Sequence, residues 1–133
     1  MVEFTGEYEG ALHCRVVHGP SGTVLATDAP KDNQGKGEAF SPTDLVAAAL
    51  ASCMATTMAF AARRHGVELD GLRYRATKEM SPSGPRRIAR LTVQFWLPPA
   101  AKSLPAGLLD AAARGCPVQI SLAPDMEKVL EFH

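Results

Sequence analysis

The sequence predicts a mixed α+β protein, and three observations predict it. The first third of the chain alternates apolar and polar residues, as antiparallel strands do. A long alanine-rich segment follows, which indicates a helix, and a second alternating block lies between residues 69 and 97. With 133 residues the chain is long enough for one ordinary core, so we expect a single domain over residues 1–133.

The first third predicts a meander of two or three strands. Alternation covers residues 2–8, 11–18 and 23–27, and the turn at 19–22 contains two glycines and a proline. Residues 28–40 have few apolar side chains and predict a loop without structure of its own. A loop of this length is often functional.

The alanine-rich segment carries strong signals at both ends. Ser41 can cap a helix, Pro42 suits its first position, and Asp44 completes a capping box. We expect the helix to run to residue 64 or 65 and to end at Gly66. Its alanines leave little side-chain bulk, so it can approach another backbone closely, including a copy of itself. Polar residues interrupt its apolar run, which favours a helix packed in protein over a membrane span.

The second half predicts two strands, two helices and a closing strand. Residues 69–79 and 86–97 indicate the strands, with the odd-numbered residues from 89 to 97 on the core face. Residues 105–114 indicate a helix that Gly115 ends. A short third helix then begins at Cys116, and residues 126–132 indicate the last strand.

Charge and composition exclude several classes of function. Acidic and basic residues balance at 14 each, so we expect no nucleic-acid or membrane partner. The polar amino terminus shows no secretory signal, and three cysteines do not form a disulfide scaffold, so we expect a cytoplasmic protein. No metal-ligand or phosphate-binding spacing is present, so we expect neither a metal nor a cofactor.

Cys116 occupies the position before a helical proline. As a helix cap, its thiolate would face unpaired backbone amides, and these lower the pKa of a thiol. The alternative is a small residue that fills space at a tight bend.

Cys53 lies in the middle of the alanine-rich helix, where we expect it to be buried. Apolar surroundings raise the pKa of a thiol, so helix position alone favours an inert core cysteine. A nucleophilic Cys53 would need an arginine or lysine from elsewhere, with a carboxylate to orient it. The third cysteine, Cys14, follows His13 in a strand. Neighbouring strand residues point to opposite faces, so this pair is a poor metal site.

Two segments resemble a known family. Residues 41–53, SPTDLVAAALASC, are similar to the first-cysteine helix of the OsmC/Ohr family, and residues 115–118, GCPV, are similar to its second-cysteine motif. The order of elements matches over essentially the whole chain. The resemblance implies an OsmC-like α+β fold, with antiparallel sheets around a long central helix and two chains intertwined into a homodimer.

The resemblance also implies an activity, the reduction of organic hydroperoxides by a thiol-dependent peroxidase. Cys53 would attack the peroxide and become a sulfenic acid, and Cys116 would resolve it to a disulfide. A dithiol reductant, in this family often a lipoylated protein, would restore both thiols.

One departure from the family concerns the activation of Cys53. Family members use an amino-terminal arginine paired with a glutamate, but no arginine lies between Arg15 and Arg63. The groups that could activate or orient Cys53 instead are Lys31, Lys36, Glu38, Arg15 and Asp44. A lysine lacks the planar fork of a guanidinium.

Two further hypotheses stand beside the peroxidase. The missing arginine motivates the first, a non-catalytic OsmC-like dimer that binds a small apolar ligand in its interface pocket. An intramolecular Cys53–Cys116 disulfide after mild hydroperoxide treatment would distinguish the peroxidase from this binding dimer. The second is a structural oligomer whose cysteines only pack, and it predicts that Cys53→Ser affects stability but no activity.

Overall fold

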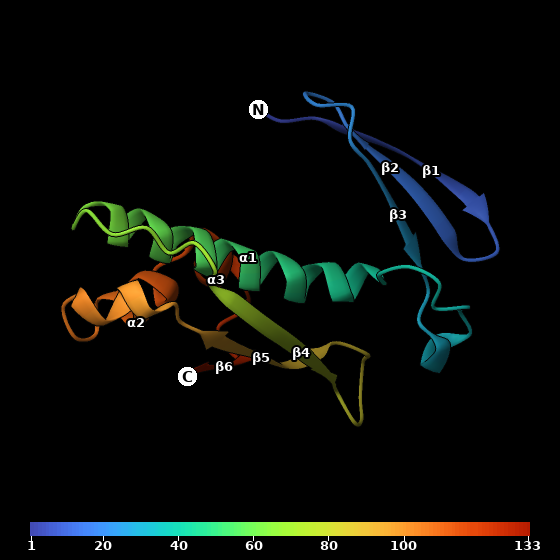
Figure 1. The fold of residues 1–133 in the computed structure, drawn as a ribbon. Helices are drawn as coiled ribbons and strands as arrows, with labels where there is room; N and C mark the ends of the chain where they lie inside the picture. Colours follow the sequence, from blue (N-terminus) through green and yellow to red (C-terminus); the bar gives the residue numbers. More distant parts are fainter. The chain divides into compact units, whose positions relative to one another are not determined.

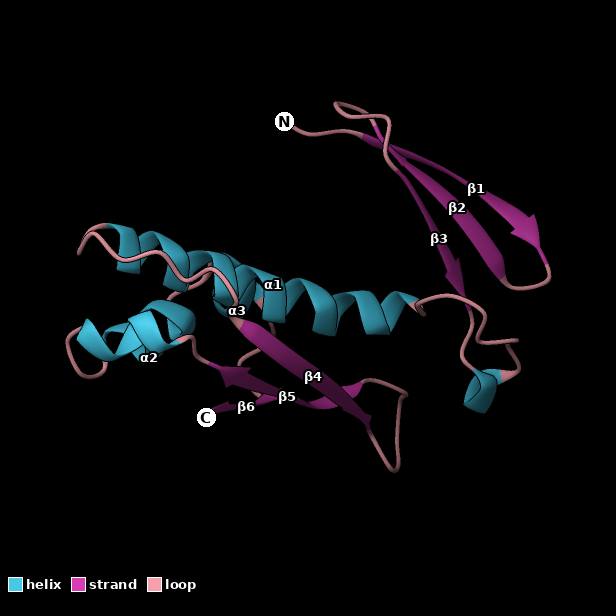
Figure 2. Cartoon of the chain, in the orientation of Figure 1, coloured by secondary structure: helices cyan, strands magenta, loops and turns pink.

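The computed structural model describes all residues from 1 to 133 and confirms the mixed α+β composition. The chain divides into two compact units, Met1–Val46 and Ala47–His133, and helix α1 (Pro42–Arg63) begins in the first and continues through the second. The strands form two three-stranded sheets, and the chain contains three α-helices. Figure 2 colours the strands and helices by type. The expectation of one domain over the whole chain stays a prediction.

The first unit contains the predicted meander. Its strands are β1 (Phe4–Gly10), β2 (His13–His18) and β3 (Val24–Asp28), which pair antiparallel in the order β1-β2-β3. Within these strands only Thr27 and Asp28 are buried. The sheet therefore has almost no core of its own.

The loop after β3 is a compact closed structure with one short 3₁₀ turn, η1 (Lys31–Asn33), where we expected no regular structure. The amide of Asp28 donates to the carbonyl of Phe40 (3.1 Å), which joins the two ends of the loop. Inside it, the amide of Gly37 donates to the carbonyl of Ala29 (3.2 Å). A Cβ at position 35 would overlap that same Ala29 carbonyl, so only glycine fits at Gly35.

A buried carboxylate anchors this loop to the sheet. Asp28 Oδ1 lies 2.6 Å from His13 Nδ1, and Asp28 Oδ2 accepts a hydrogen bond from the amide of Glu38 (2.9 Å). The hydrogen bond from His13 is the main cause that lowers the pKa of Asp28, and the Glu38 amide and the charges of His13 and Lys36 act in the same direction. Burial of Asp28 opposes them but is outweighed.

Helix α1 begins with the predicted capping box. The amide of Asp44 donates to Ser41 Oγ (3.0 Å), and the amide of Ser41 donates to Asp44 Oδ2 (2.8 Å). The helix ends at Arg63, shortly before Gly66, which has a left-handed φ of 71°. By length and composition α1 could cross a membrane, but the core helix of a soluble protein passes the same test. The absence of a membrane partner stays a prediction.

The second unit is built on the sheet β4-β5-β6, formed by β4 (Arg73–Met80), β5 (Ile88–Trp96) and β6 (Glu127–Phe132). The predicted core face of β5 is confirmed, because Leu91, Val93 and Phe95 are at most 1% exposed. Figure 1 shows α1 and the later helix α2 (Leu108–Arg114) on one side of this sheet. The buried residues on these helices complete the core: Ala47, Leu50, Ala51, Met54, Met58, Ala62, Leu109 and Ala113.

Two expectations about the second half were wrong. We expected antiparallel sheets, but β6 pairs parallel with β5, because the chain crosses over between them through η2 (Pro99–Ser103), α2 and α3 (Pro117–Ser121). A crossover of this length is what parallel pairing requires. We also expected the second helix to start at residue 105, but it starts at Leu108, since Gly107 has a left-handed φ of 78°.

The Asp28–His13 contact predicts a pH-dependent stability. The pKa of Asp28 is lowered by folding, so the folded state gains stability from it above the ordinary aspartate pKa of 3.8 and loses that gain as the pH falls through the lowered value. Asp28→Asn should therefore destabilise the protein at pH 7, with a smaller effect near pH 3. Urea unfolding between pH 3 and pH 7 measures this. Asp70→Asn, at an exposed position, is the control, and a pH-independent loss in Asp28→Asn would contradict the prediction.

Candidate redox site

Cys53 is held in the middle of α1, on a helix whose backbone is fixed by local hydrogen bonds. The Thr57 hydroxyl donates to the carbonyl of Cys53 (2.7 Å), one turn further on. Cys53 is only half-buried, whereas its neighbours Leu50 and Met54 are fully buried. Our expectation of a buried Cys53 was therefore wrong, because the residue lies at the edge of the buried helix face rather than at its centre.

Cys116 is the predicted helix cap. It has an extended backbone (φ −67°, ψ 144°) and precedes Pro117, the first residue of α3. Its sulfur accepts a hydrogen bond from the amide of Gln119 at 3.3 Å. Gly115, which ends α2, turns the chain so that Cys116 is completely buried.

The two cysteines meet within the second unit. The side chain of Cys53 lies close enough to that of Cys116 to raise the pKa of the Cys116 thiol, although the two residues belong to different helices and are far apart in the sequence. Both are free thiols in this structure. Neither has a charged group as a hydrogen-bond partner inside the second unit. The site is therefore a pair of neighbouring thiols, one partly buried and one fully buried.

Burial, rather than the helix start, determines the acidity of Cys116. Burial is the largest cause that raises the pKa of this thiol, and its hydrogen bond to Cys53 and the charge of Cys53 raise it further. The amides of Gln119 and Val118 lower the pKa, as we expected of a helix cap, but they are outweighed. The expectation of a more acidic Cys116 was therefore wrong, and this thiol retains its proton and can donate it to Cys53.

A depression of about 540 Å³ begins one helical turn beyond Cys53. Helix α1 forms one wall of this depression, and the end of α2, next to Cys116, forms the other. We call it the α1–α2 depression, and its lining residues are Thr57, Phe60, Ala61, Arg64, Ala112 and Gly115. It can hold an apolar group close to the two thiols.

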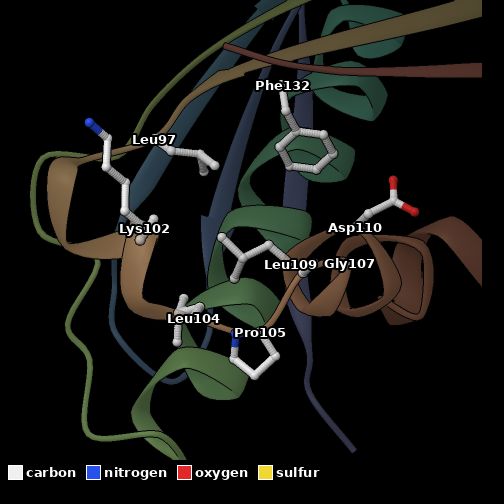
Figure 3. Close-up of a pocket in the computed structure, with 10 residues that line it drawn as sticks. Leu97, Lys102, Leu104, Pro105, Gly107, Leu109, Asp110 and Phe132 are labelled. Carbon is white, nitrogen blue, oxygen red and sulfur yellow. The ribbon is translucent and has the colours of Figure 1, made fainter.

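A second depression, of about 360 Å³, lies at the end of the β5–β6 pair (Figure 3). The side chains of Leu97, Leu109 and Phe132 converge in it, with Lys102 and Asp110 on opposite sides. Asp110 is already paired with Arg114 (3.0 Å). No cysteine lines this depression, so it is not part of the thiol site. No cluster of three metal-ligating side chains occurs in the chain.

The five residues proposed to activate Cys53 all lie in the first unit. Asp44 is engaged in the capping box of α1, and Arg15 and Lys31 are exposed. Lys36 and Glu38 line a depression of about 340 Å³ together with His13 and Asp28. Their activating role stays a prediction.

The His13–Asp28 pair of the first unit is a feature that sequence reasoning missed. The two residues are directly opposite each other in the β2–β3 register. The pairing register of strands β2 and β3 would have placed His13 opposite Asp28, but the sequence analysis did not predict this register.

The structure is an α+β fold with two free thiols, one on α1 and one at the start of α3, and the comparisons assign its family. The family model described as OsmC-like protein matches residues 35–128 of the chain. The chain therefore belongs to the OsmC-like family, as its two cysteine motifs indicated. The sequence has no match among curated proteins.

Solved structures agree with this assignment. A candidate osmotic stress-induced and detoxification response protein of Psychrobacter arcticus is 36% identical, with a TM-score of 0.91 over 100% of this chain and 96% of that one. An organic hydroperoxide resistance protein OsmC of Legionella pneumophila is 15% identical (TM-score 0.77; 99% and 96% covered). The organic hydroperoxide resistance protein OhrB of Bacillus subtilis is 17% identical (TM-score 0.71; 100% and 98% covered).

The raised pKa of Cys116 gives a testable acidity profile. Alkylation of Cys116 by iodoacetamide should rise only above the pH range of an ordinary thiol, because burial and Cys53 disfavour its thiolate. In Cys53→Ser the pH midpoint should move downward, since the charge of Cys53 is lost, while burial still holds the midpoint above the ordinary value. Mass spectrometry of each cysteine peptide measures this, with Cys14 as an internal control. An unchanged midpoint in Cys53→Ser would show that the two thiols do not interact.

Proposed function

We propose that the protein is a thiol-dependent peroxidase that reduces organic hydroperoxides, with Cys53 as the attacking thiol and Cys116 as the resolving thiol. The observation that carries the proposal is the proximity of these two free thiols, through which Cys53 raises the pKa of Cys116. Neighbouring thiols can form a disulfide where their backbones come within bridging distance. The difference in burial supports the assignment of roles, because Cys53 is only partly buried and so can meet a substrate, whereas Cys116 is completely buried.

In the first step the Cys53 thiolate attacks the peroxide. A sulfur–oxygen bond forms, the O–O bond breaks, and the alkoxide takes up a proton and leaves as an alcohol. Cys53 is oxidised by two electrons to a sulfenic acid. Cys116 keeps its own proton during this step because its pKa is raised by burial and by the charge on Cys53. It therefore stabilises the Cys53 thiolate by a hydrogen bond without competing as a nucleophile.

In the second step the roles of the thiols change. The sulfenic acid at Cys53 carries no thiolate charge, so one of the causes that raise the pKa of Cys116 disappears. The Cys116 sulfur then attacks Cys53, a disulfide forms, and the hydroxyl leaves as water with the proton of Cys116. A dithiol reductant, such as a lipoylated protein, donates two electrons, becomes a disulfide itself and restores both thiols. We place this cycle in the cytoplasm, where such dithiols are kept reduced.

The family supports this proposal at the level of a role in peroxide resistance. Structural neighbours from Legionella pneumophila and Bacillus subtilis are named organic hydroperoxide resistance proteins. A further neighbour from Vibrio cholerae, a candidate protein of the same kind, has captopril bound in one of its active sites. These neighbours are at most 19% identical to the chain, so they support the fold and the comparison rather than a mechanism.

We further propose that the working form is a homodimer. One face of α1 is exposed and carries mostly small side chains, namely Ala49, Ser52, Thr56 and Phe60, of which Phe60 is 58% exposed. The β1-β2-β3 sheet also leaves large apolar side chains exposed, among them Phe4 and Tyr8. A three-stranded sheet needs an apolar face packed against something to be stable. A second copy of the chain would cover both surfaces.

A non-catalytic ligand-binding dimer is the second candidate function. The observation that favours it is the lack of a cationic partner for Cys53 within the second unit. Without such a partner, the Cys53 thiolate has only the neutral Cys116 thiol, and no positive charge, to stabilise it in that unit. The α1–α2 depression would then hold a small apolar ligand without chemistry.

Peroxide turnover separates these candidates. The reduced protein should consume cumene hydroperoxide in the presence of dihydrolipoamide. Cys53→Ser should lose this activity by at least about a thousandfold, since the nucleophile itself is removed. Cys116→Ser should still react once and then accumulate the Cys53 sulfenic acid, which dimedone labels. Cys14→Ser is the matched control and should keep full activity. No turnover by the fully reduced wild type would reject the peroxidase and favour the binding function.

The homodimer predicts a mass of twice 14.1 kDa in solution. Ala49→Arg places a long charged side chain on the exposed face of α1 and should shift the protein toward monomer at micromolar concentration. Light scattering coupled to gel filtration measures both. Ala106→Arg makes the same change at an exposed position outside this face and should remain dimeric. A monomeric wild type would rule the dimer out.

A further inference from the structure

The depression at the end of the β5–β6 pair takes no part in the proposed thiol chemistry. Its volume is about 360 Å³, and none of its lining residues belongs to α1 or to the β1-β2-β3 sheet. It therefore shares no residue with the surfaces proposed for the dimer. Sites for small molecules have volumes of about 300–1,000 Å³, so this depression is large enough for a small ligand.

The floor of this depression is apolar and contains an aromatic ring. The side chains of Leu97, Leu109 and Phe132 converge there (Figure 3). The Phe132 ring stacks on the ring of Phe95, with centroids 5.6 Å apart and an interplanar angle of 23°, and Phe95 is fully buried. The stack holds the Phe132 ring in place where it lines the depression. A second aromatic ring, supplied by a ligand, can pack against such a fixed ring favourably.

The apolar surface is confined to the depression, which favours a small ligand over a protein partner. The large apolar side chains that the second unit exposes are Phe60, Tyr74 and Ile120, and none of them lines the depression. Surfaces that bind proteins usually expose a contiguous apolar patch around their centre. We therefore infer an occupant that enters the depression rather than one that covers its surroundings.

Lys102 is the only charged residue at the depression without a charged partner. It is exposed, and it makes no ion pair or side-chain hydrogen bond. Asp110, on the opposite side (Figure 3), is neutralised by Arg114, whose Nε lies 3.0 Å from the carboxylate. The flexible four-carbon stem of Lys102 lets its ammonium reach over the opening. The charge that complements this depression is therefore negative.

We propose that the depression at the end of the β5–β6 pair binds an aromatic carboxylic acid, a planar ring with a short side chain that ends in a carboxylate. The ring would pack on Phe132 between the leucines, and the carboxylate would pair with the ammonium of Lys102. Phe132 then determines the preference for a ring, and Lys102 determines the preference for a negative charge. The inference does not rest on the proposed peroxidase function, because no cysteine lines this depression.

The competing explanation is that the depression is only a water-filled edge of the core. The chain offers matched controls that separate the two explanations. Ala106 lines the depression, whereas Ala100, which is equally exposed, does not. Lys31 is an exposed lysine of the first unit, so its substitution changes the net charge as a substitution of Lys102 does.

The experiment titrates the isotope-labelled full-length protein with naphthylacetate and follows the amide chemical shifts by NMR. The shifts should saturate with a Kd on the order of 1 mM, which is ordinary for a ligand of this size. The largest shifts should fall at Leu97, Leu109 and Phe132. Lys102→Gln should weaken naphthylacetate binding by about two- to fivefold, the size of an exposed ion pair, and leave the neutral naphthylacetamide unchanged. Lys31→Gln should change neither ligand.

Substitutions inside the depression test its shape and its ring. Ala106→Leu fills the depression and should weaken both ligands, whereas Ala100→Leu should weaken neither. Phe132→Leu should weaken naphthylacetate by about two- to tenfold, and its fully saturated analogue by less, because only the aromatic ligand loses ring stacking. Ala106 and Lys102 are exposed, so their variants still decide the outcome if Phe132→Leu unfolds the protein.

Three results would overturn the inference. The first is the absence of saturating shifts at about ten times the expected Kd. The second is a set of shifts confined to the α1–α2 depression, which would place the acid at the thiol site instead. The third is an equal loss of binding in Lys102→Gln and Lys31→Gln, which would show that only the net charge of the protein acts on the ligand.

Discussion

The contact between the Cys53 and Cys116 side chains is the constraint on which the second unit depends. Cys53 lies in the middle of a long helix, and Cys116 begins a short one. Between the two cysteines the chain forms the β4–β5 hairpin and then helix α2. Helix α2 must end next to α1 if Cys116 is to lie beside Cys53. Gly115 ends α2 at the required place, and Pro117 immediately starts the next helix, so that the intervening Cys116 is fixed in an extended conformation. The parallel β5–β6 pairing is a consequence of the same crossover.

The difference in burial gives the two thiols different chemistry. Without this difference in burial, both thiols could act as the attacking nucleophile. Complete burial and the neighbouring charge keep the proton on Cys116, while the partly buried Cys53 is the thiol that we propose meets the substrate. Oxidation of Cys53 removes the charge that suppresses Cys116. The order of the proposed steps therefore follows from the electrostatics of one contact and does not need a separate conformational change.

Local signals in the sequence were sufficient to predict most helices and strands. They failed to predict properties that depend on residues distant in the chain. The capping box of Ser41 and Asp44, the core face of β5 and the Cys116 cap depend on neighbours in the chain, and all three are confirmed. The pKa of Cys116 depends on burial and on a partner from another helix, so the local signal gave the wrong direction. The start of α2 was misplaced because Gly107 carries a left-handed turn that the periodicity does not reveal. The activating partner of Cys53 cannot be derived from spacing either, because it would come from a part of the chain distant in sequence.

The closed loop between β3 and α1 limits how such a partner could be supplied. Lys36 and Glu38 do not lie on independent flexible segments, because the Asp28 carboxylate accepts from the Glu38 amide and the Asp28 amide donates to the carbonyl of Phe40. His13 completes this arrangement from the neighbouring strand. Lys36 and Glu38, which line the depression of the first unit, are therefore held in fixed positions relative to each other. The ionised Asp28 carboxylate maintains this geometry. If this loop activates Cys53, its charged groups act together as one preorganised unit. The buried Asp28 carboxylate, which no sequence motif predicted, holds the loop in this arrangement.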